Sequence, residues 1–596
     1  MAVNEPYISE INVPSKMRDG ADLYTDVCRP NTPGRYPAIL IRSPYSKRRV
    51  GAMLGDLMDI PRIVSAGYVL VIQDIRGSGA SGGEFRRYET EMADSYDPVE
   101  WVAMQPWCNG NVGMYGVSAL GVNQWRAAIM QPPHLKAICP GMATSAVRRG
   151  WLFLTEGGVF RLHNLVNWYV MMCAANVGKA DVPPDKLEAL KGRVASMQQN
   201  LEEQFRFLPL KDIPGIKIME EIGMGTAHPF ADYVAHLGDD DYWKQILGPA
   251  PLEKVTVPAF QICGYLEDGG NEAISSYMGM RERGGTLLAR QNQKLILGPW
   301  MHGRLERFLG DLDFGEEATG KAIDALGMQL RWFDYWLKGI DNGMMDEPPV
   351  KLFVMGDNVW RDENKWPLAR TQYTPFYFHS SGRANSRFGD GILSIEAPGE
   401  EPVDSYTYDP MDPAPSVGGL NSAVLKVIEV EDQEAVEKRN DVLVFTSAPL
   451  EADIEVTGPI VIKLFAISSA VDTDFTGKLV DVWPNGKAYN LADGIVRARY
   501  RKSVLNPEFI EPGKVYEYGI TLRATSNVFK AGHRIRVQIS SSNFPKWDRN
   551  PNTGHTIGQD AETQKAVQTI YHNGQYPSHI LLPVIPREGG RKREEK

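Results

Sequence analysis

Short apolar runs alternate with helix-like segments over the first third of the chain. Each run is bounded by glycine, proline or polar residues, as buried strands are; the runs lie at 37–42, 68–74, 112–115 and 135–139. Between them, 97–104 and 119–130 show helical spacing of apolar residues, and Asp97 and Pro98 predict where the first helix begins. This alternation predicts a mostly parallel sheet with helices on both faces.

The pattern changes twice further along the chain. From 148 to 242, amphipathic helix patterns such as 185–207 replace the strand-like runs. Strand-like runs return at 258–264 and 294–298, and a helix is predicted over 323–337. From 349 onward, short strands alternate with turn residues and no helices intervene; they lie at 351–354, 455–465, 478–483, 515–522 and 534–540. Strands spaced in this way predict an antiparallel sandwich or jelly roll.

These changes predict the domain organisation. The α/β core is expected in two parts, 1–147 and 243–348, with a helical cap inserted at 148–242. The C-terminal β-sandwich, of the jelly-roll type, is expected at 349–596. Several domains also agree with the length, because 596 residues is several times the ~100–200 residues of an average domain.

Charge and composition narrow the expected partners. The net charge is −10 at pH 7, and the one basic run, 587–596, is mixed with acids, so no nucleic acid partner is predicted. No run of ~18 apolar residues occurs, so no membrane span is predicted. Residues 1–14 lack the apolar core of a signal peptide, and the cysteines are scattered without Cys-x-x-Cys spacing. We therefore expect reduced thiols and a cytoplasmic location.

A candidate nucleophile lies where a strand meets a helix. The segment 114–121 reads MYGVSALG, in which a strand ends near Tyr115 and a helix starts directly after Ser118. A serine in this context sits on a tight turn with its hydroxyl exposed above the sheet, and the backbone N–H of Ala119 is placed to stabilise an oxyanion. The alternative is that Ser118 only caps the helix. The usual Gly-x-Ser-x-Gly pattern is not met, because the second glycine comes one place late, at Gly121.

Two more strand ends carry the other groups that a serine hydrolase needs. The segment 294–303 (KLILGPWMHG) ends in a loop with His302, and 258–268 (PAFQICGYLED) ends with Glu267 and Asp268. The chain order serine, acid, histidine is that of the α/β-hydrolase fold. His302 would take the serine proton and return it to the leaving group, while a carboxylate orients the imidazole. Either Glu267 or Asp268 could be that carboxylate.

With these residues in place, the chain resembles the family of cocaine-esterase-like hydrolases and X-Pro dipeptidyl peptidases, which also holds the α-amino-acid ester hydrolases. The motifs that carry the resemblance are 42–47 (RSPYSK), 73–85 (QDIRGSGASGGEF), 113–121, 297–303 (LGPWMHG) and 333–339 (FDYWLKG). The resemblance implies an α/β-hydrolase core with an inserted helical cap and a C-terminal jelly roll. It also implies that the hydroxyl of Tyr45 contributes to the oxyanion hole and that homo-oligomers are possible.

The sequence departs from the family pattern at several places. An aromatic residue usually follows the serine, where this chain has Ala119. The family acid usually lies three residues after a glycine, and counting from Gly264 favours Glu267, with Asp268 kept as the second candidate. Two carboxylates that hold the substrate ammonium in α-amino-acid ester hydrolases fall on Gly269 and Gly270, which weakens the amino-ester and β-lactam acylase alternatives.

The sequence therefore predicts a serine hydrolase of the carboxylesterase type acting on a small-molecule ester. An X-Pro dipeptidyl peptidase and an amide or β-lactam acyl hydrolase stay open as alternatives. Because serine, histidine and a carboxylate complete the chemistry, no metal or cofactor is predicted, and the glycine-rich loop 77–82 is a weak match to a dinucleotide-binding motif. Four cap aromatics are candidates for the lid or acyl pocket, with ordinary core packing as the alternative: Trp151, Phe153, Phe160 and Trp168.

Overall fold

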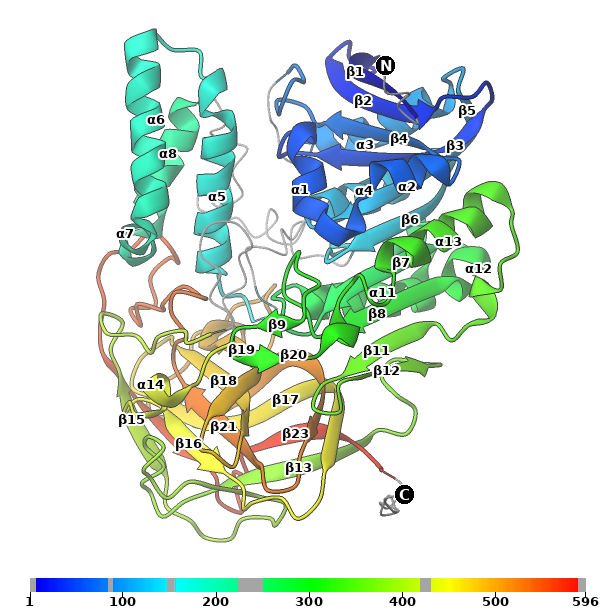
Figure 1. The fold of residues 1–596 in the computed structure, drawn as a ribbon. Helices are drawn as coiled ribbons and strands as arrows, with labels where there is room; N and C mark the ends of the chain where they lie inside the picture. The colour runs from blue at the N-terminus through cyan, green and yellow to red at the C-terminus, as the bar shows by residue number, and fades with distance from the viewer. Residues whose placement is uncertain are drawn as a thin grey trace.

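The computed structural model describes residues 7–83, 89–146, 155, 157–222, 250–418 and 430–587, and it contains two large sheets and a group of helices beside them (Figure 1). In Figure 1 the blue strands and the green strands β7, β8, β11 and β12 form the first sheet, and the yellow to red strands belong to the second. The cyan helices α5–α8 stand beside the N-terminal part of the first sheet.

The first sheet has ten strands and a mostly parallel centre. In spatial order they are β1 (Tyr7–Lys16), β2 (Asp22–Pro30), β4 (Val69–Asp74), β3 (Tyr36–Ser43), β5 (Cys108–Val117), β6 (Leu135–Gly141), β7 (Ala259–Gly264), β8 (Gln293–Gly298), β11 (Val350–Val354) and β12 (Val359–Glu363). The pairs from β4 to β11 are parallel, whereas β1, β2 and β12 join antiparallel at the two edges. This arrangement confirms the predicted α/β core.

Helices cover both faces of the first sheet. They are α1 (Val50–Leu54), α2 (Ile60–Ser65), α3 (Glu89–Ala103), α4 (Ala119–Met130), α11 (Gly270–Arg283), α12 (Leu287–Gln291) and α13 (Ala325–Lys338). Alternate residues of β3 belong to different cores. Leu40 packs in the cluster that contains Trp125 of α4, and Ile41 packs in the cluster that contains Trp332 of α13. Because successive strand residues point to opposite faces, this alternation is what a sheet buried on both sides requires.

The predicted start of α3 is wrong. Helix α3 spans Glu89–Ala103, so Pro98 lies inside the helix and not at its first position. The carboxylate of Asp97 does not act as a helix cap, because it accepts hydrogen bonds from the backbone and the guanidinium of Arg18. Asp97 therefore contacts Arg18, which lies between β1 and β2 and 79 residues away in the sequence.

The cap segment contains four described helices, α5 (Leu162–Asn176), α6 (Pro184–Gln199), α7 (Leu201–Arg206) and α8 (Pro214–Glu221). The single helix predicted over 185–207 is two helices, which break at Asn200. Buried residues of these helices share one hydrophobic cluster with the first sheet, so the cap packs on the core. The predicted cap boundaries, 147/148 and 242/243, lie outside the described residues.

The second sheet is antiparallel apart from the short pairing of β14 with β16. Its strands are β13 (Gln372–His379), β14 (Ile392–Ser394), β15 (Asp404–Tyr408), β16 (Leu443–Thr446), β17 (Ile454–Ser468), β18 (Asp474–Val482), β19 (Ala488–Arg497), β20 (Tyr516–Phe529), β21 (Arg534–Ser540), β22 (Ala566–Tyr571) and β23 (His579–Ile585). This confirms a β-rich C-terminal domain. It also has one short helix, α14 (Glu434–Glu437), while the two-stranded ribbon of β9 (Phe308–Leu309) and β10 (Leu312–Asp313) precedes it.

One strand expected in the C-terminal domain belongs to the first sheet. Residues 351–354 lie in β11, which pairs in parallel with β8 and antiparallel with β12. A short buried apolar run carries no local signal of which sheet it joins. The two domains are joined here, because the backbone N–H of Met355 donates to the carbonyl of Ser526 in β20 at 3.0 Å. Among the described residues, no helix has the length and apolar character to cross a membrane.

Candidate active site

Ser118 occupies a strained turn between β5 and α4. Its φ is 63° and ψ is −127°, in a region that residues other than glycine rarely adopt, and such strain is common at functional sites. Two glycines make room for the turn. A Cβ at Gly116 would come within 2.6 Å of Leu120, and a Cβ at Gly121 would come within 2.6 Å of Ala143. The Ser118 side chain makes no capping hydrogen bond to the helix, so the helix-cap alternative does not describe it.

The loop after β8 brings His302 to a buried carboxylate. Nδ1 of His302 lies 2.8 Å from Oε2 of Glu267, whose side chain is fully buried. The other carboxylate oxygen, Oε1, accepts a hydrogen bond from the thiol of Cys263 at 3.0 Å. Burial raises the pKa of this thiol well above its usual value, so Cys263 stays protonated and acts as a donor. Glu267 is therefore fixed by two contacts, one at each oxygen.

Asp268 has other partners and connects three parts of the fold. Its Oδ1 lies 2.9 Å from Nζ of Lys546 in the C-terminal domain, and its Oδ2 accepts from the amide of Asn164 in α5 at 3.0 Å. Burial opposes ionisation of Asp268, but the positive charges of Lys546, Arg161 and Arg523 lower its pKa below the usual value. Asp268 also lines a separate cavity of about 280 Å³, whose other walls come from the cap segment, α11 and the C-terminal domain.

Tyr45 lies against Ser118. The two residues line the same cavity, and the indole N–H of Trp168 in α5 donates to the Tyr45 hydroxyl at 3.2 Å. Burial raises the pKa of Tyr45, so its hydroxyl keeps its proton and can donate. Ala119 is the first residue of α4, and the N–H of a first helical residue has no acceptor within the helix. Both donors predicted for an oxyanion hole thus lie next to Ser118.

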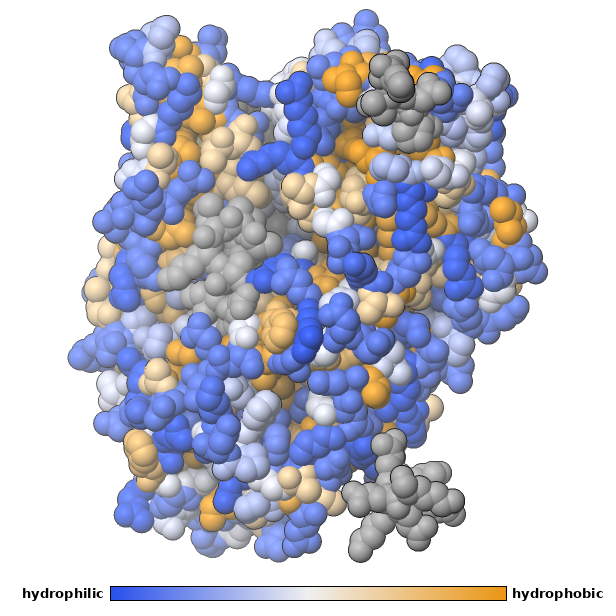
Figure 2. Space-filling model, viewed as in Figure 1, coloured by the Kyte–Doolittle hydropathy of each residue, from blue (hydrophilic) through white to orange (hydrophobic). Residues whose placement is uncertain are grey.

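Ser118, Tyr45 and His302 line one cavity of about 670 Å³. Its apolar walls come from the loop after β3, from α1 and α4, and from the cap helix α5; they include Met53, Leu54, Val117, Leu120, Trp168 and Met171. Figure 2 shows a notch on this face of the molecule, between the cap helices and the core around α1. The cavity therefore lies between two regions that are far apart in the sequence, which is common for substrate sites.

The predicted cap aromatics have different positions. Trp168 lines the cavity. Phe160 does not line it: its side chain is in the hydrophobic core, and its N–H donates to Oδ1 of Asp548 at 2.8 Å, so the structure gives it a packing role. Trp151 and Phe153 lie outside the described residues. Arg48, Arg49 and Asn164 also line the cavity and were not predicted, because no local sequence pattern shows which side chains will face a cavity between the core and the cap.

The glycine-rich loop 77–82 closes around a carboxylate of the chain. Oδ2 of Asp74 accepts from the N–H of Ala80 at 2.8 Å and from Nζ of Lys47 at 3.1 Å. Gly79 has φ +49°, and a Cβ there would lie 2.1 Å from Asp74. The place that a phosphate would take in a dinucleotide-binding loop therefore holds the Asp74 side chain. Because Lys47 follows Tyr45 by two residues, this contact also fixes the loop that carries Tyr45.

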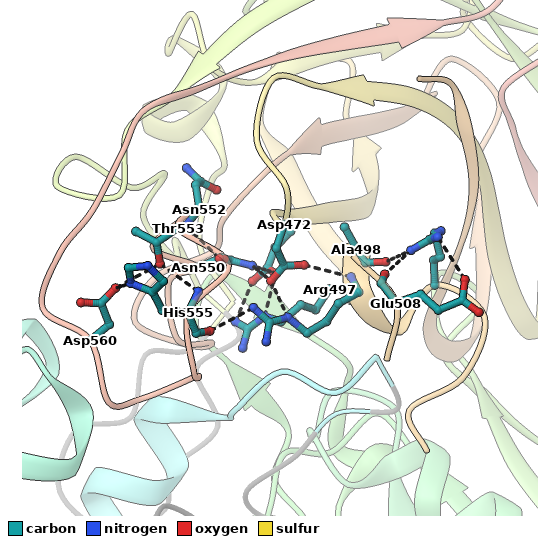
Figure 3. A network of polar contacts seen from close by, with 12 residues as sticks. Asp472, Arg497, Ala498, Glu508, Asn550, Asn552, Thr553, His555 and Asp560 are labelled. Atoms are coloured by element: carbon teal, nitrogen blue, oxygen red, sulfur yellow. Dashed lines mark hydrogen bonds and ion pairs between the residues drawn. The ribbon is translucent and has the colours of Figure 1, made fainter. Parts of the chain in front are cut away.

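A separate surface group has the composition of a metal site. His555, Asp560 and Glu562 offer ligand atoms within 4.8 Å of one another. Nδ1 of His555 lies 2.7 Å from Oδ2 of Asp560. Figure 3 shows this pair in a loop near a polar network around Asp472 and Arg497. None of the three residues lines the cavity with Ser118, so we assign no step of the chemistry to them.

Glycines at the two family carboxylate positions do not shape the cavity. Gly269 precedes α11 and Gly270 begins it, and neither is among the lining residues. A Cβ at Gly270 would lie 2.8 Å from the carbonyl of Gly264, so a larger residue would disturb the end of β7.

Comparison with known proteins supports the resemblance in both domains. Residues 19–304 match the family model of the X-Pro dipeptidyl-peptidase (S15 family), and residues 342–581 match that of the X-Pro dipeptidyl-peptidase C-terminal non-catalytic domain. The chain is 39% identical over 590 residues to cocaine esterase from Rhodococcus sp. (strain MB1 Bresler), covering 98% of this chain and 100% of that protein. It is 27% identical over 536 residues to a putative Xaa-Pro dipeptidyl-peptidase of Bacillus cereus, covering 88% and 76%.

Solved structures share the whole architecture. An α-amino acid ester hydrolase superposes with a TM-score of 0.76 at 25% identity and covers 98% of this chain and 97% of its own. An aminopeptidase from a Thaumarchaeota archaeon superposes with a TM-score of 0.77 at 25% identity and the same coverage. The chain therefore belongs to the CocE/NonD family of serine hydrolases, which it shares with cocaine esterase and the S15 X-Pro dipeptidyl peptidases.

Proposed function

We propose that this protein is a carboxylesterase that uses Ser118 as nucleophile, His302 as general base and Glu267 as the orienting acid. The observation that carries the proposal is the arrangement around one cavity: Ser118 and His302 line it, and buried Glu267 bonds His302 from behind at 2.8 Å. A serine hydroxyl attacks a carbonyl only when a neighbouring base takes its proton.

The roles follow from the hydrogen bonds. Nδ1–H of His302 donates to Glu267, which leaves Nε2 to accept the proton of Ser118 as the Ser118 oxygen bonds to the ester carbon. The protonated imidazole then gives this proton to the alkoxide as the alcohol leaves. Water, deprotonated by His302 in the same way, attacks the acyl-enzyme and releases the acid and the free serine.

The oxyanion of each tetrahedral intermediate needs donors that are already in place. Tyr45 supplies its hydroxyl, which Trp168 holds by donating to it, and Ala119 supplies its backbone N–H. Donors that are oriented before the reaction stabilise the developing charge without reorganisation.

The charge of the cavity favours an ester over a dipeptide with a free amine. Among the described lining residues, the one carboxylate is Glu306, which is paired with Arg304, while the arginines number three: Arg48, Arg49 and Arg304. A dipeptidyl peptidase needs an anion to hold the substrate ammonium, since a charge that loses its hydration without a partner is costly. An α-amino-acid ester hydrolase would need such an anion as well, because its substrate also carries an ammonium group.

The predicted preference for esters over dipeptides with a free amine is tested by comparing esters with dipeptide anilides. We expect turnover of 4-nitrophenyl acetate and butyrate, and kcat/KM for glycyl-prolyl-4-nitroanilide at least about a hundredfold lower, because the described lining residues include no unpaired carboxylate to hold the ammonium. 4-Nitroacetanilide serves as the control that separates amide reactivity from recognition of the dipeptide. Faster hydrolysis of the dipeptide anilide than of both esters would assign the protein to the peptidases.

A further inference from the structure

Three arginines line the cavity close to the proposed catalytic residues. Arg48 and Arg49 belong to the short 3-10 helix η1 (Lys47–Arg49), which begins two residues after Tyr45. Arg304 follows His302 by two residues. The segments that carry the oxyanion donor and the proposed base therefore also carry the positive charges of the cavity.

Two of these charges have no counter-charge among the described residues. Arg304 is paired with Glu306. The side chains of Arg48 and Arg49 are exposed, and in the described part of the chain neither has a hydrogen-bond or ion-pair partner. The neighbouring Lys47 differs, because it is buried and paired with Asp74 at 3.1 Å. Of the three consecutive basic residues Lys47, Arg48 and Arg49, the two without a paired acid are therefore the arginines that line the cavity.

The rest of the lining suits an apolar chain. Met53 and Leu54 follow the arginines in α1, and Met171 and Trp168 line the cavity from the cap. In Figure 2, mostly hydrophilic residues border the notch on its core side, while apolar residues lie within it. A cavity of this kind fits a ligand that is apolar along most of its length and negatively charged at one end. Guanidinium groups suit such an end, because they bind carboxylates through two parallel hydrogen bonds.

From this arrangement we infer that the substrates are esters that carry a carboxylate, which Arg48 and Arg49 bind while the ester carbonyl lies at Ser118. The inference rests on the proposed esterase function and adds the class of substrate. The two arginines are specificity residues: they act on the remote charge of the substrate and take no part in the bond changes at the carbonyl.

The test uses two pairs of probes, and the members of each pair are similar in size and shape but differ in charge. Mono(4-nitrophenyl) adipate is compared with 4-nitrophenyl 6-methylheptanoate, in which an isopropyl group replaces the carboxylate. A second pair places the charge on the leaving group: 4-carboxyphenyl acetate against 4-carbamoylphenyl acetate. Rates are corrected for uncatalysed hydrolysis, and the protein is compared with the double variant Arg48→Gln/Arg49→Gln.

In at least one pair, we expect the double variant to lose about tenfold in kcat/KM for the anionic ester and less than about twofold for the neutral one, as for two exposed charge contacts. The same preference should fall as NaCl rises from 0.05 to 1 M, since the Debye length shrinks to about 3 Å at 1 M. Arg193→Gln is the matched control. Arg193 lies on α6, is paired with Glu221 and does not line the cavity, so both esters should react as in the unchanged protein.

Equal losses for the anionic and neutral members of both pairs would overturn the inference, and so would a preference that Arg48→Gln/Arg49→Gln leaves intact. In either case turnover of the neutral esters would leave the esterase proposal standing. If the folded protein turned over none of the esters, the esterase proposal itself would fail.

Discussion

Replacing Glu267 by glutamine is expected to lower kcat for ester hydrolysis by about 10³–10⁴-fold, by analogy with the acid of other serine hydrolases. The amide would occupy the same volume at the buried position but would no longer stabilise the imidazolium of His302. The loss should fall on kcat, because Glu267 does not line the substrate cavity. The measurement is steady-state kinetics with 4-nitrophenyl butyrate.

Asp268→Asn is the comparison that separates the two candidate acids. Asp268 bonds Asn164 and Lys546, so this variant should change stability and binding more than the chemical step, with a loss in kcat below about tenfold. A second control is Glu100→Gln, because Glu100 holds Nδ1 of His134 at 2.7 Å in a similar pair outside the cavity. Equal and mild losses from the Glu267 and Asp268 variants would rule out the proposed triad.

Removing the hydroxyl of Tyr45 is expected to cause the second largest loss. Tyr45→Phe should lower kcat by about 10²–10³-fold, which is the usual effect of losing one oxyanion donor. KM should change little, since the hydroxyl contributes most once the carbonyl oxygen becomes negative. The melting temperature should also change little, because the phenyl ring keeps the packing of Tyr45 in the core.

Tyr36→Phe is the matched control for this variant. Its hydroxyl bonds that of Thr32 at 2.6 Å in an exposed position at the start of β3, at the opposite end of this strand from the loop that carries Tyr45. The control should keep full activity. If Tyr45→Phe kept at least about half of the original kcat, the oxyanion would have to be stabilised without Tyr45.

The sheet was the most predictable part of the fold, because its central strands are buried on both faces and appear as continuous apolar runs. The start of α3 was not predictable, since Asp97 and Pro98 form a good local start signal that the contact of Asp97 with Arg18 overrides. The sheet to which β11 belongs was likewise decided by pairing with β8, which is distant in the sequence.

The candidate site also has a part that could be predicted from the sequence and a part that could not. Ser118, His302 and Glu267 follow strand ends, and parallel strands bring such ends to one edge of a sheet, so their proximity could be predicted. The contacts that distinguish Glu267 from Asp268 depend on His302, Asn164 and Lys546, which come from three different regions. The arginines of the cavity could not be identified from sequence, because their position relative to the cap depends on tertiary packing.

The most direct test of the esterase proposal is to identify the nucleophile by covalent labelling. The protein is incubated with a fluorophosphonate, which reacts with activated serines, and the labelled residue is located by peptide mass spectrometry, with Ser118→Ala as the comparison. We predict one phosphonylated residue, Ser118, with loss of esterase activity in proportion to labelling and neither labelling nor activity in the variant. Full esterase activity in Ser118→Ala, or activity lost through a label on another residue, would contradict this prediction.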